Sequence, residues 1–303
     1  MKRILLLTIC FLSALALSGD TVRKSLDEIL KPQFMQVNDG RLYVTEKAVV
    51  HVFSVDDGKR LHSFGKLGEG PQEFKMFPGT ALHLDFKNGA PVVFSIGKVS
   101  FFDRDGKFVS EKKTTRMLNR VYFAGDSFAA LGFKQDNQKV TITVDICDNN
   151  LVKKKELYSY EVTKGSSVKL LEKTFGFRTE NNRLYIARGT DFMISVMDTD
   201  GKGLGQVRLE YEREKLTKSH KDKIFRWYRT NPMTRPYADQ IISSLIMPSH
   251  FPAIRDFMVS DGILYVQTYR QADAKTEFYI IDAKNEKQTK LRKKTMLKIH
   301  RDN

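Results

Sequence analysis

The feature that most constrains this chain is a pattern of four short strands joined by tight turns. Each unit alternates apolar and polar residues, as half-buried strands do, and its hairpins carry Asp-Gly or Asn-Gly turns. The pattern recurs over residues 34–65, 81–112, 120–157, 175–210 and 254–293. Sheets of four antiparallel strands, repeated in this way, predict an all-β fold, a β-propeller of four-stranded blades.

The alternating apolar residues of these units predict the core between neighbouring blades. A blade buries both faces against its neighbours, so side chains at these positions are expected to pack and not to bind a ligand. The expected core residues are Leu42, Val44, Val52, Phe53, Phe101, Phe102, Ile194, Val196, Tyr279 and Ile280.

The connection between the first two units, Phe64 to Pro78, reads FGKLGEGPQEFKMFP. Its glycines and Pro71 predict a tight connection with special backbone angles. Together with the strands on either side, it resembles the blade-to-blade connection of NHL-type propellers and of bacterial six-bladed β-propeller proteins. This resemblance covers most of residues 24–290 and implies six blades, where five are countable. The sixth would be assembled from residues 20–32, residues 158–174 and the C-terminal strand.

Residues 211–252 interrupt the strand pattern and predict a helical hairpin that covers part of one propeller face. Residues 211–230 carry apolar side chains at helical spacings, and Asn231-Pro232 ends the helix. Residues 237–246 predict a second short helix. The return to a strand contains Arg255-Asp256, which is similar to the corresponding return in the same propeller family.

The first 18 residues predict a cleaved signal peptide. Lys2 and Arg3 precede an apolar run over residues 4–17, and small residues follow it. The run is shorter than the roughly 20 residues of a membrane-spanning helix. Cleavage would leave a single propeller domain, residues 19–303, with no transmembrane segment. We expect this domain in a bacterial periplasm or outside the cell.

The chain is strongly basic, with 51 Lys and Arg against 36 Asp and Glu and a formal charge of +15. A basic excess is typical of proteins that meet a polyanion, and export argues against nucleic acid. The alternatives are an anionic lipid, lipopolysaccharide phosphates or an acidic partner protein. The plainer interpretation is a solvated C-terminal tail, about residues 284–303, which carries Lys284, Lys287, Lys290, Arg292, Lys293, Lys294, Lys298 and Arg301.

Residues typical of catalytic or metal sites are scattered, and neither a metal site, a cofactor nor a catalytic residue is predicted. Without the signal, Cys147 is the only cysteine, and its strand-like neighbours predict a buried core position. The six histidines lie at unequal positions in the units, without the spacing of a metal pair. The Asp-rich turns at residues 103–106 and 198–201 lack the acidic ligands of a calcium loop.

The predicted binding surface is on the helical segment. Phe225, Trp227 and Tyr228 lie among two arginines, and Trp, Tyr and Arg dominate interface hot spots. Irregular segments on a rigid scaffold are also common binding sites. The alternative is that Phe225 and Trp227 only fix the hairpin to the propeller. The candidate binding residues are Arg226, Trp227, Tyr228, Arg229 and Arg255.

These features favour a non-catalytic interaction module of the cell envelope that binds a protein, peptide or glycan. Two other functions stay open. A propeller hydrolase or lyase would need a convergent cluster of His, Asp or Glu at the central channel. A structural subunit of an envelope assembly would instead expose a broad apolar patch near Trp227. A propeller fold does not choose among them, because it hosts unrelated activities.

Overall fold

The structure is a computed structural model of the 303-residue chain. It describes residues 26, 28–76, 82–114, 116, 118–136, 139–163, 168–171, 174–273, 275–283 and 290–298. The predicted signal peptide, residues 1–18, lies outside the described residues.

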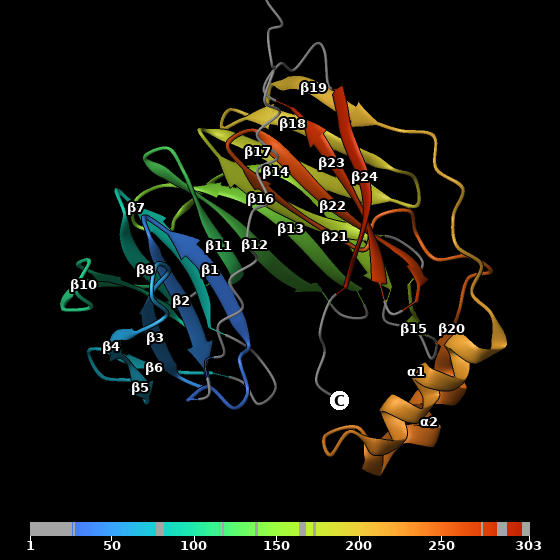
Figure 1. Ribbon diagram of the computed structural model, residues 1–303, viewed down its shortest axis with the longest axis horizontal. Helices are drawn as coiled ribbons and strands as arrows, with labels where there is room; N and C mark the ends of the chain where they lie inside the picture. The colour runs from blue at the N-terminus through green and yellow to red at the C-terminus, as the bar shows by residue number, and fades with distance from the viewer. Residues whose placement is uncertain are drawn as a thin grey trace, which may run out of the picture.

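Five four-stranded antiparallel sheets, in which consecutive strands are neighbours, form the blades (Figure 1). Blade 1 contains β1 (Phe34–Asn38), β2 (Arg41–Glu46), β3 (Val49–Ser54) and β4 (Arg60–Phe64). Blade 2 contains β7 (His83–Lys87), β8 (Ala90–Ser95), β9 (Lys98–Phe102) and β10 (Phe108–Lys113). Blade 3 contains β11 (Leu118–Ala124), β12 (Ser127–Asp136), β13 (Lys139–Cys147) and β14 (Lys153–Thr163).

The last two blades flank the helical excursion. Blade 4 contains β16 (Thr174–Glu180), β17 (Arg183–Gly189), β18 (Met193–Asp198) and β19 (Gly203–Arg208). Blade 5 contains β21 (Asp256–Ser260), β22 (Ile263–Ala272), β23 (Lys275–Asp282) and β24 (Lys290–Lys298). Between them lie α1 (Lys218–Thr230), the 3-10 helix η1 (Arg235–Tyr237), α2 (Ala238–Ser244) and β20 (Leu245–Ile246). The predicted all-β propeller with a helical hairpin insertion is confirmed.

The blades follow one another in chain order along an arc, from the blue blade 1 to the orange and red blade 5 (Figure 1). The first strand of each blade lies on the inside, since β1 contacts β7, β7 contacts β11, β11 contacts β16 and β16 contacts β21. Buried apolar clusters seal the interfaces between blades 1 and 2, 2 and 3, 3 and 4, and 4 and 5. Packing between blades, as the strand alternation predicts, therefore holds the arc together.

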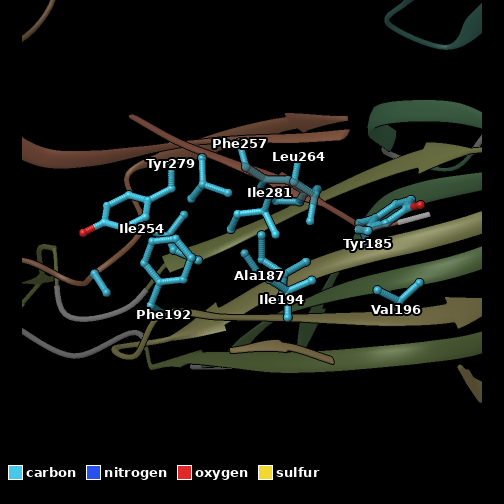
Figure 2. Packing of buried hydrophobic residues seen from close by; sticks show 14 residues of the cluster. Tyr185, Ala187, Phe192, Ile194, Val196, Ile254, Phe257, Leu264, Tyr279 and Ile281 are labelled. Carbon is cyan, nitrogen blue, oxygen red and sulfur yellow. The ribbon is translucent and has the colours of Figure 1, made fainter. Parts of the chain in front are cut away.

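The interface between blades 4 and 5 shows how this packing works (Figure 2). Phe192 and Ile194 of the blade 4 side meet Tyr279 and Ile281 of blade 5, and the Phe192 and Tyr279 rings lie edge to face with centroids 5.1 Å apart. Of the ten predicted core residues, seven are buried: Val44, Val52, Phe53, Phe102, Ile194, Val196 and Tyr279. Leu42, Phe101 and Ile280 are only partly buried.

Among the described residues, no apolar cluster joins blade 5 to blade 1. Met35 and Val37 on β1 are each 60% exposed, and Met258 on β21 is 58% exposed. Two of the three segments expected to build a sixth blade are used elsewhere: residues 158–163 belong to β14 of blade 3, and the C-terminal strand β24 completes blade 5. The third segment, residues 20–32, lies largely outside the described residues. In addition, β15 (Val168–Lys169) pairs in parallel with β20. The assignment of residues 158–163 and the C-terminal strand to a sixth blade is wrong, and six blades remains a prediction from the resemblance.

The FGKLGEGPQEF connection forms a compact loop between blades 1 and 2. Its strands β5 (Lys66–Leu67) and β6 (Glu73–Phe74) pair in parallel, and Phe74 is fully buried. Glu73 accepts a hydrogen bond of 2.8 Å from the Gly70 N–H. The buried Lys98 ammonium donates to the Gly70 carbonyl at 2.6 Å and pairs with Glu111 at 2.9 Å. A buried cation therefore fixes the loop, because its charge is compensated on both sides.

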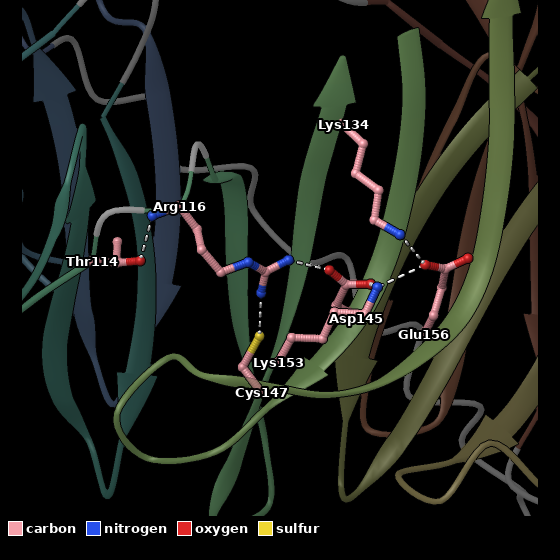
Figure 3. A network of polar contacts seen from close by, with 7 residues as sticks. All are labelled: Thr114, Arg116, Lys134, Asp145, Cys147, Lys153 and Glu156. Atoms are coloured by element: carbon pink, nitrogen blue, oxygen red, sulfur yellow. Dashed lines mark hydrogen bonds and ion pairs between the residues drawn. The ribbon is translucent and has the colours of Figure 1, made fainter. Parts of the chain in front are cut away.

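A second polar network ties blade 3 to the segment that leads into it (Figure 3). Arg116 pairs with the buried Asp145 and donates to Cys147 Sγ at 3.1 Å. Lys153 bridges Asp145, at 3.0 Å, and Glu156, at 2.6 Å. Cys147 is buried, as predicted, and burial raises the pKa of its thiol. In this setting the cysteine is a core residue and not a reactive thiolate.

No helix in the described part of the chain is long and apolar enough to cross a membrane.

Candidate functional site

The helical hairpin, residues 218–244, leaves the propeller and projects away from its blades (Figure 1). Helix α1 contains no buried residue. Its main packing partners in the described structure are α2 and η1. The expectation that the hairpin covers a propeller face is therefore wrong, because the two helices pack mainly on each other.

The base of the hairpin is fixed by backbone pairing that the sequence pattern did not reveal. The Leu216 N–H donates to the Ser249 carbonyl, and the Phe251 N–H donates to the Glu214 carbonyl, each at 2.9 Å. This pairing keeps residues 211–216 extended, and the helix begins only at Lys218. Thr217 is the N-cap, and its side chain accepts a hydrogen bond from the His220 N–H.

The far end of the hairpin is equally well fixed. The Asn231 N–H caps α1 by donating to the Trp227 carbonyl at 2.9 Å, and Asn231 Oδ1 accepts from the Met233 N–H at 2.9 Å. Thr234 Oγ1 donates to the Tyr228 carbonyl at 2.8 Å. The predicted stop at Asn231-Pro232 is where the helix ends. These hydrogen bonds therefore fix the backbone of the turn.

We call residues 226–237 the hairpin tip. Three of its large apolar side chains are exposed: Trp227 by 53%, Met233 by 58% and Tyr237 by 63%. The Trp227 and Tyr228 rings lie edge to face with centroids 5.0 Å apart. Exposed aromatic side chains on a rigid element are typical of a contact surface, because they lose little entropy on binding.

Four of the five candidate binding residues lie together on the last turns of α1. Arg226, Trp227 and Arg229 are exposed, while Tyr228 is partly buried. Arg229 pairs with Asp239 of α2 at 3.2 Å. The sequence pattern missed Met233, Arg235 and Tyr237, whose only signal is their place beside prolines in the turn between two helices.

Arg255, the fifth candidate residue, lies outside the tip. It precedes β21, where its guanidinium lies over the Tyr269 ring at 5.7 Å. Tyr269 in turn stacks on Phe251 at 4.4 Å. Since Phe251 belongs to the paired base of the hairpin, Arg255 belongs to the packing that anchors the hairpin on blade 5.

The inner strands carry a second group of polar and aromatic residues, near the axis of the arc. Arg178 on β16 pairs with Asp256 on β21 at 2.9 Å, and its guanidinium lies 5.9 Å from the centroid of the Tyr122 ring. The His83 ring meets Tyr122 edge to face at 4.5 Å. These contacts link the inner strands of blades 2 to 5 to one another.

Burial shifts the pKa values of two titratable groups on β7, His83 and Asp85, toward their neutral forms. Burial, followed by the charges of Arg120 and Arg178, lowers the pKa of His83 to about 3. Burial raises the pKa of Asp85 to about 6. Two backbone hydrogen bonds stabilise the carboxylate and offset part of this shift. His83 is packed among Phe34, Phe94 and Tyr122, so its imidazole serves as an aromatic core group.

The described residues contain no group of three or more His, Cys, Asp or Glu that could hold a metal ion. A shallow polar pocket of about 330 Å³ lies between the turns of blades 4 and 5. Its carboxylates are Glu180 and Asp261, and Glu180 accepts a hydrogen bond from the Gly262 N–H at 2.7 Å. That hydrogen bond joins the two blades, which gives the carboxylate a structural partner.

No protein-family model matches this chain, and no curated protein matches it. Among solved structures it is similar to the β-propeller domain of Cps50 (Swd1) from Myceliophteria thermophila, with 12% identity, a TM-score of 0.42, and coverage of 88% of this chain and 72% of that one. It is also similar to the WD40 domain of Neurospora crassa Pan2, with 13% identity, a TM-score of 0.43, and coverage of 88% and 66%.

A third similar structure is BamB from Moraxella catarrhalis, with 11% identity and a TM-score of 0.37. The likeness covers 88% of this chain and 61% of BamB, so this chain spans less than two thirds of that protein. Likeness at these identities concerns the fold alone.

Proposed function

We propose that this protein is an exported, non-catalytic binding module of the cell envelope, and that the hairpin tip is its binding surface. The observation that carries the proposal is a hairpin that projects from the propeller (Figure 1) and exposes Trp227, Met233 and Tyr237. Arginines lie among these side chains, and this composition is typical of interface hot spots.

The construction of the hairpin supports a binding role over a packing role. A hairpin that only stabilised the propeller would bury its aromatic residues against a blade, whereas Trp227 is 53% exposed. The backbone pairing at its base and the hydrogen-bonded turn at its tip hold it in place. Preorganisation of this kind lowers the entropy lost on binding.

Export is supported by the basic start and the apolar run of residues 1–18, typical of a signal peptide. The proposal therefore places the protein in a bacterial periplasm or outside the cell. The partner would be a component of the envelope: a protein, a peptide, a glycan or a lipid.

A pull-down from detergent-solubilised and untreated envelope fractions tests the proposal. The bait is the protein itself, compared with an Arg226→Ala, Trp227→Ala, Arg229→Ala variant. Loss of a hot-spot residue costs 2 kcal/mol or more, so we expect the variant to retain a component at least about thirtyfold more weakly.

A matched control carries Lys107→Ala, Val109→Ala and Lys113→Ala, which remove two charges and an exposed apolar side chain from blade 2. This control should retain the component as the wild type does. Equal capture by the tip variant and the control would refute the assignment of binding to the tip.

A further inference from the structure

We propose that the hairpin tip binds the surface of an anionic phospholipid bilayer, with its apolar side chains in the interface and its arginines on the headgroups. This inference rests on the proposed function, because it names the partner of the same surface. It involves six side chains, namely Arg226, Trp227, Arg229, Met233, Arg235 and Tyr237.

The apolar part of the tip consists of three exposed side chains. Trp227 lies in the last turn of α1, Met233 lies in the turn between the helices, and Tyr237 is the last residue of η1, each more than half exposed. Tryptophan and tyrosine are enriched at the headgroup level of membranes, where one end of the ring is apolar and the other wet. Side chains that project from a turn can enter such an interface without a complementary pocket.

The charge of the tip is complementary to an anionic surface. Residues 218–237 contain six Lys or Arg and one acidic residue, Asp222. Within the described part of the chain, the Arg226 and Arg235 guanidinium groups have no carboxylate at ion-pair distance, while Arg229 has Asp239 at 3.2 Å. Two unpaired cations beside three exposed apolar side chains favour phosphate headgroups, since a basic amphipathic helix is typical of membrane surfaces.

The chain offers a direct probe, because Trp227 is its only tryptophan. Its fluorescence reports on the tip whatever the rest of the chain does. We expect vesicles of phosphatidylglycerol and phosphatidylcholine to shift the emission to the blue and to protect Trp227 from acrylamide. Vesicles of phosphatidylcholine alone should do neither, and high salt should reverse the effect by screening the arginines.

Charge variants give the expected size of the effect. Each Lys or Arg near an anionic bilayer contributes about 1 kcal/mol, so Arg226→Gln with Arg235→Gln should weaken vesicle binding about thirtyfold. Lys107→Gln with Lys113→Gln removes the same charge from exposed positions of blade 2 and should leave binding within about twofold. Met233→Ser should weaken binding at unchanged charge.

Unchanged Trp227 emission with anionic vesicles, or equal losses in the two charge variants, would overturn the lipid inference. If the envelope pull-down still depended on the tip, the proposed binding function would stand, and a protein or glycan would be the partner. If neither vesicles nor the envelope engaged the tip, the inference and the proposed function would both fail.

Discussion

At the scale of single residues, Gly65 is fixed both by its backbone and by its neighbours. Its φ is +89°, and a Cβ there would lie 2.2 Å from Phe74 Cε2 and 2.9 Å from the Ala48 carbonyl oxygen. We expect Gly65→Ala to lower the free energy of unfolding by at least about 2 kcal/mol in urea denaturation. Gly40 is the matched control, because its φ is +69° and a Cβ there would meet nothing within 4 Å. Gly40→Ala should lower the free energy of unfolding by only about 1 kcal/mol. Equal losses of unfolding free energy in the two glycine variants would contradict the packing of Phe74 on Gly65.

His83 makes the stability of the inner strands sensitive to acid. Its folded-state pKa of about 3 lies below the ordinary 6.5, so its contribution is present above pH 6.5 and is lost as the pH falls toward 3. Between pH 7 and pH 5, the wild type should lose about 2 kcal/mol relative to His83→Phe. Unfolding curves of both proteins at the two pH values measure this difference. Parallel pH dependence in the two would show that the imidazole titrates normally.

Asp85, on the same strand, has the opposite effect on how stability changes with pH. Its pKa, raised to about 6, means that the folded state takes up a proton before the unfolded state does as the pH falls. This uptake stabilises the fold between about pH 6 and pH 4 and offsets part of the loss from His83. Asp85→Asn should therefore make the acid loss of stability steeper, as measured by the midpoint of urea unfolding at pH 7 and pH 5. A shallower dependence in this variant would contradict the assigned direction.

At the scale of elements, Lys98 fixes the connection between blades 1 and 2. Its ammonium is buried and compensated by Glu111 and the Gly70 carbonyl. Lys98→Met leaves the Glu111 carboxylate without its cation and should cost about 3–5 kcal/mol of unfolding free energy. Lys98→Met combined with Glu111→Leu should recover most of that loss. If Lys98→Met cost no more than Lys107→Met at an exposed position, the buried pair would not hold the connection.

Elements whose signals are local could be predicted from the sequence. Strand alternation and Asp-Gly or Asn-Gly turns predicted the five blades, and Asn231-Pro232 predicted the end of α1. The start of α1 could not be predicted, because residues 214–216 pair with residues 249–251, far along the chain. Helical spacing in the sequence predicts an apolar stripe on α1, but it does not show whether this stripe packs against a blade or against α2. The exposure of Trp227 was therefore visible only in the structure.

At the scale of the whole molecule, none of the five described blades covers the face of β1 that points away from blade 2. Val37, on that face, is 60% exposed, whereas Val50 in the same blade is fully buried against blade 2. Val37→Ala should change the unfolding free energy by at most about 0.5 kcal/mol, and Val50→Ala should cost about 2 kcal/mol. Similar costs at the two positions would show that a further blade covers β1.

The binding role proposed for the molecule depends on a hairpin that stands away from its propeller, and acrylamide quenching of Trp227 tests this most directly. In the free protein, we predict an emission typical of a solvated indole and quenching nearly as efficient as in the denatured chain, because the side chain is 53% exposed. A blue-shifted emission that acrylamide reaches only after denaturation would contradict this prediction. It would mean that the hairpin lies on a blade and that Trp227 belongs to the core.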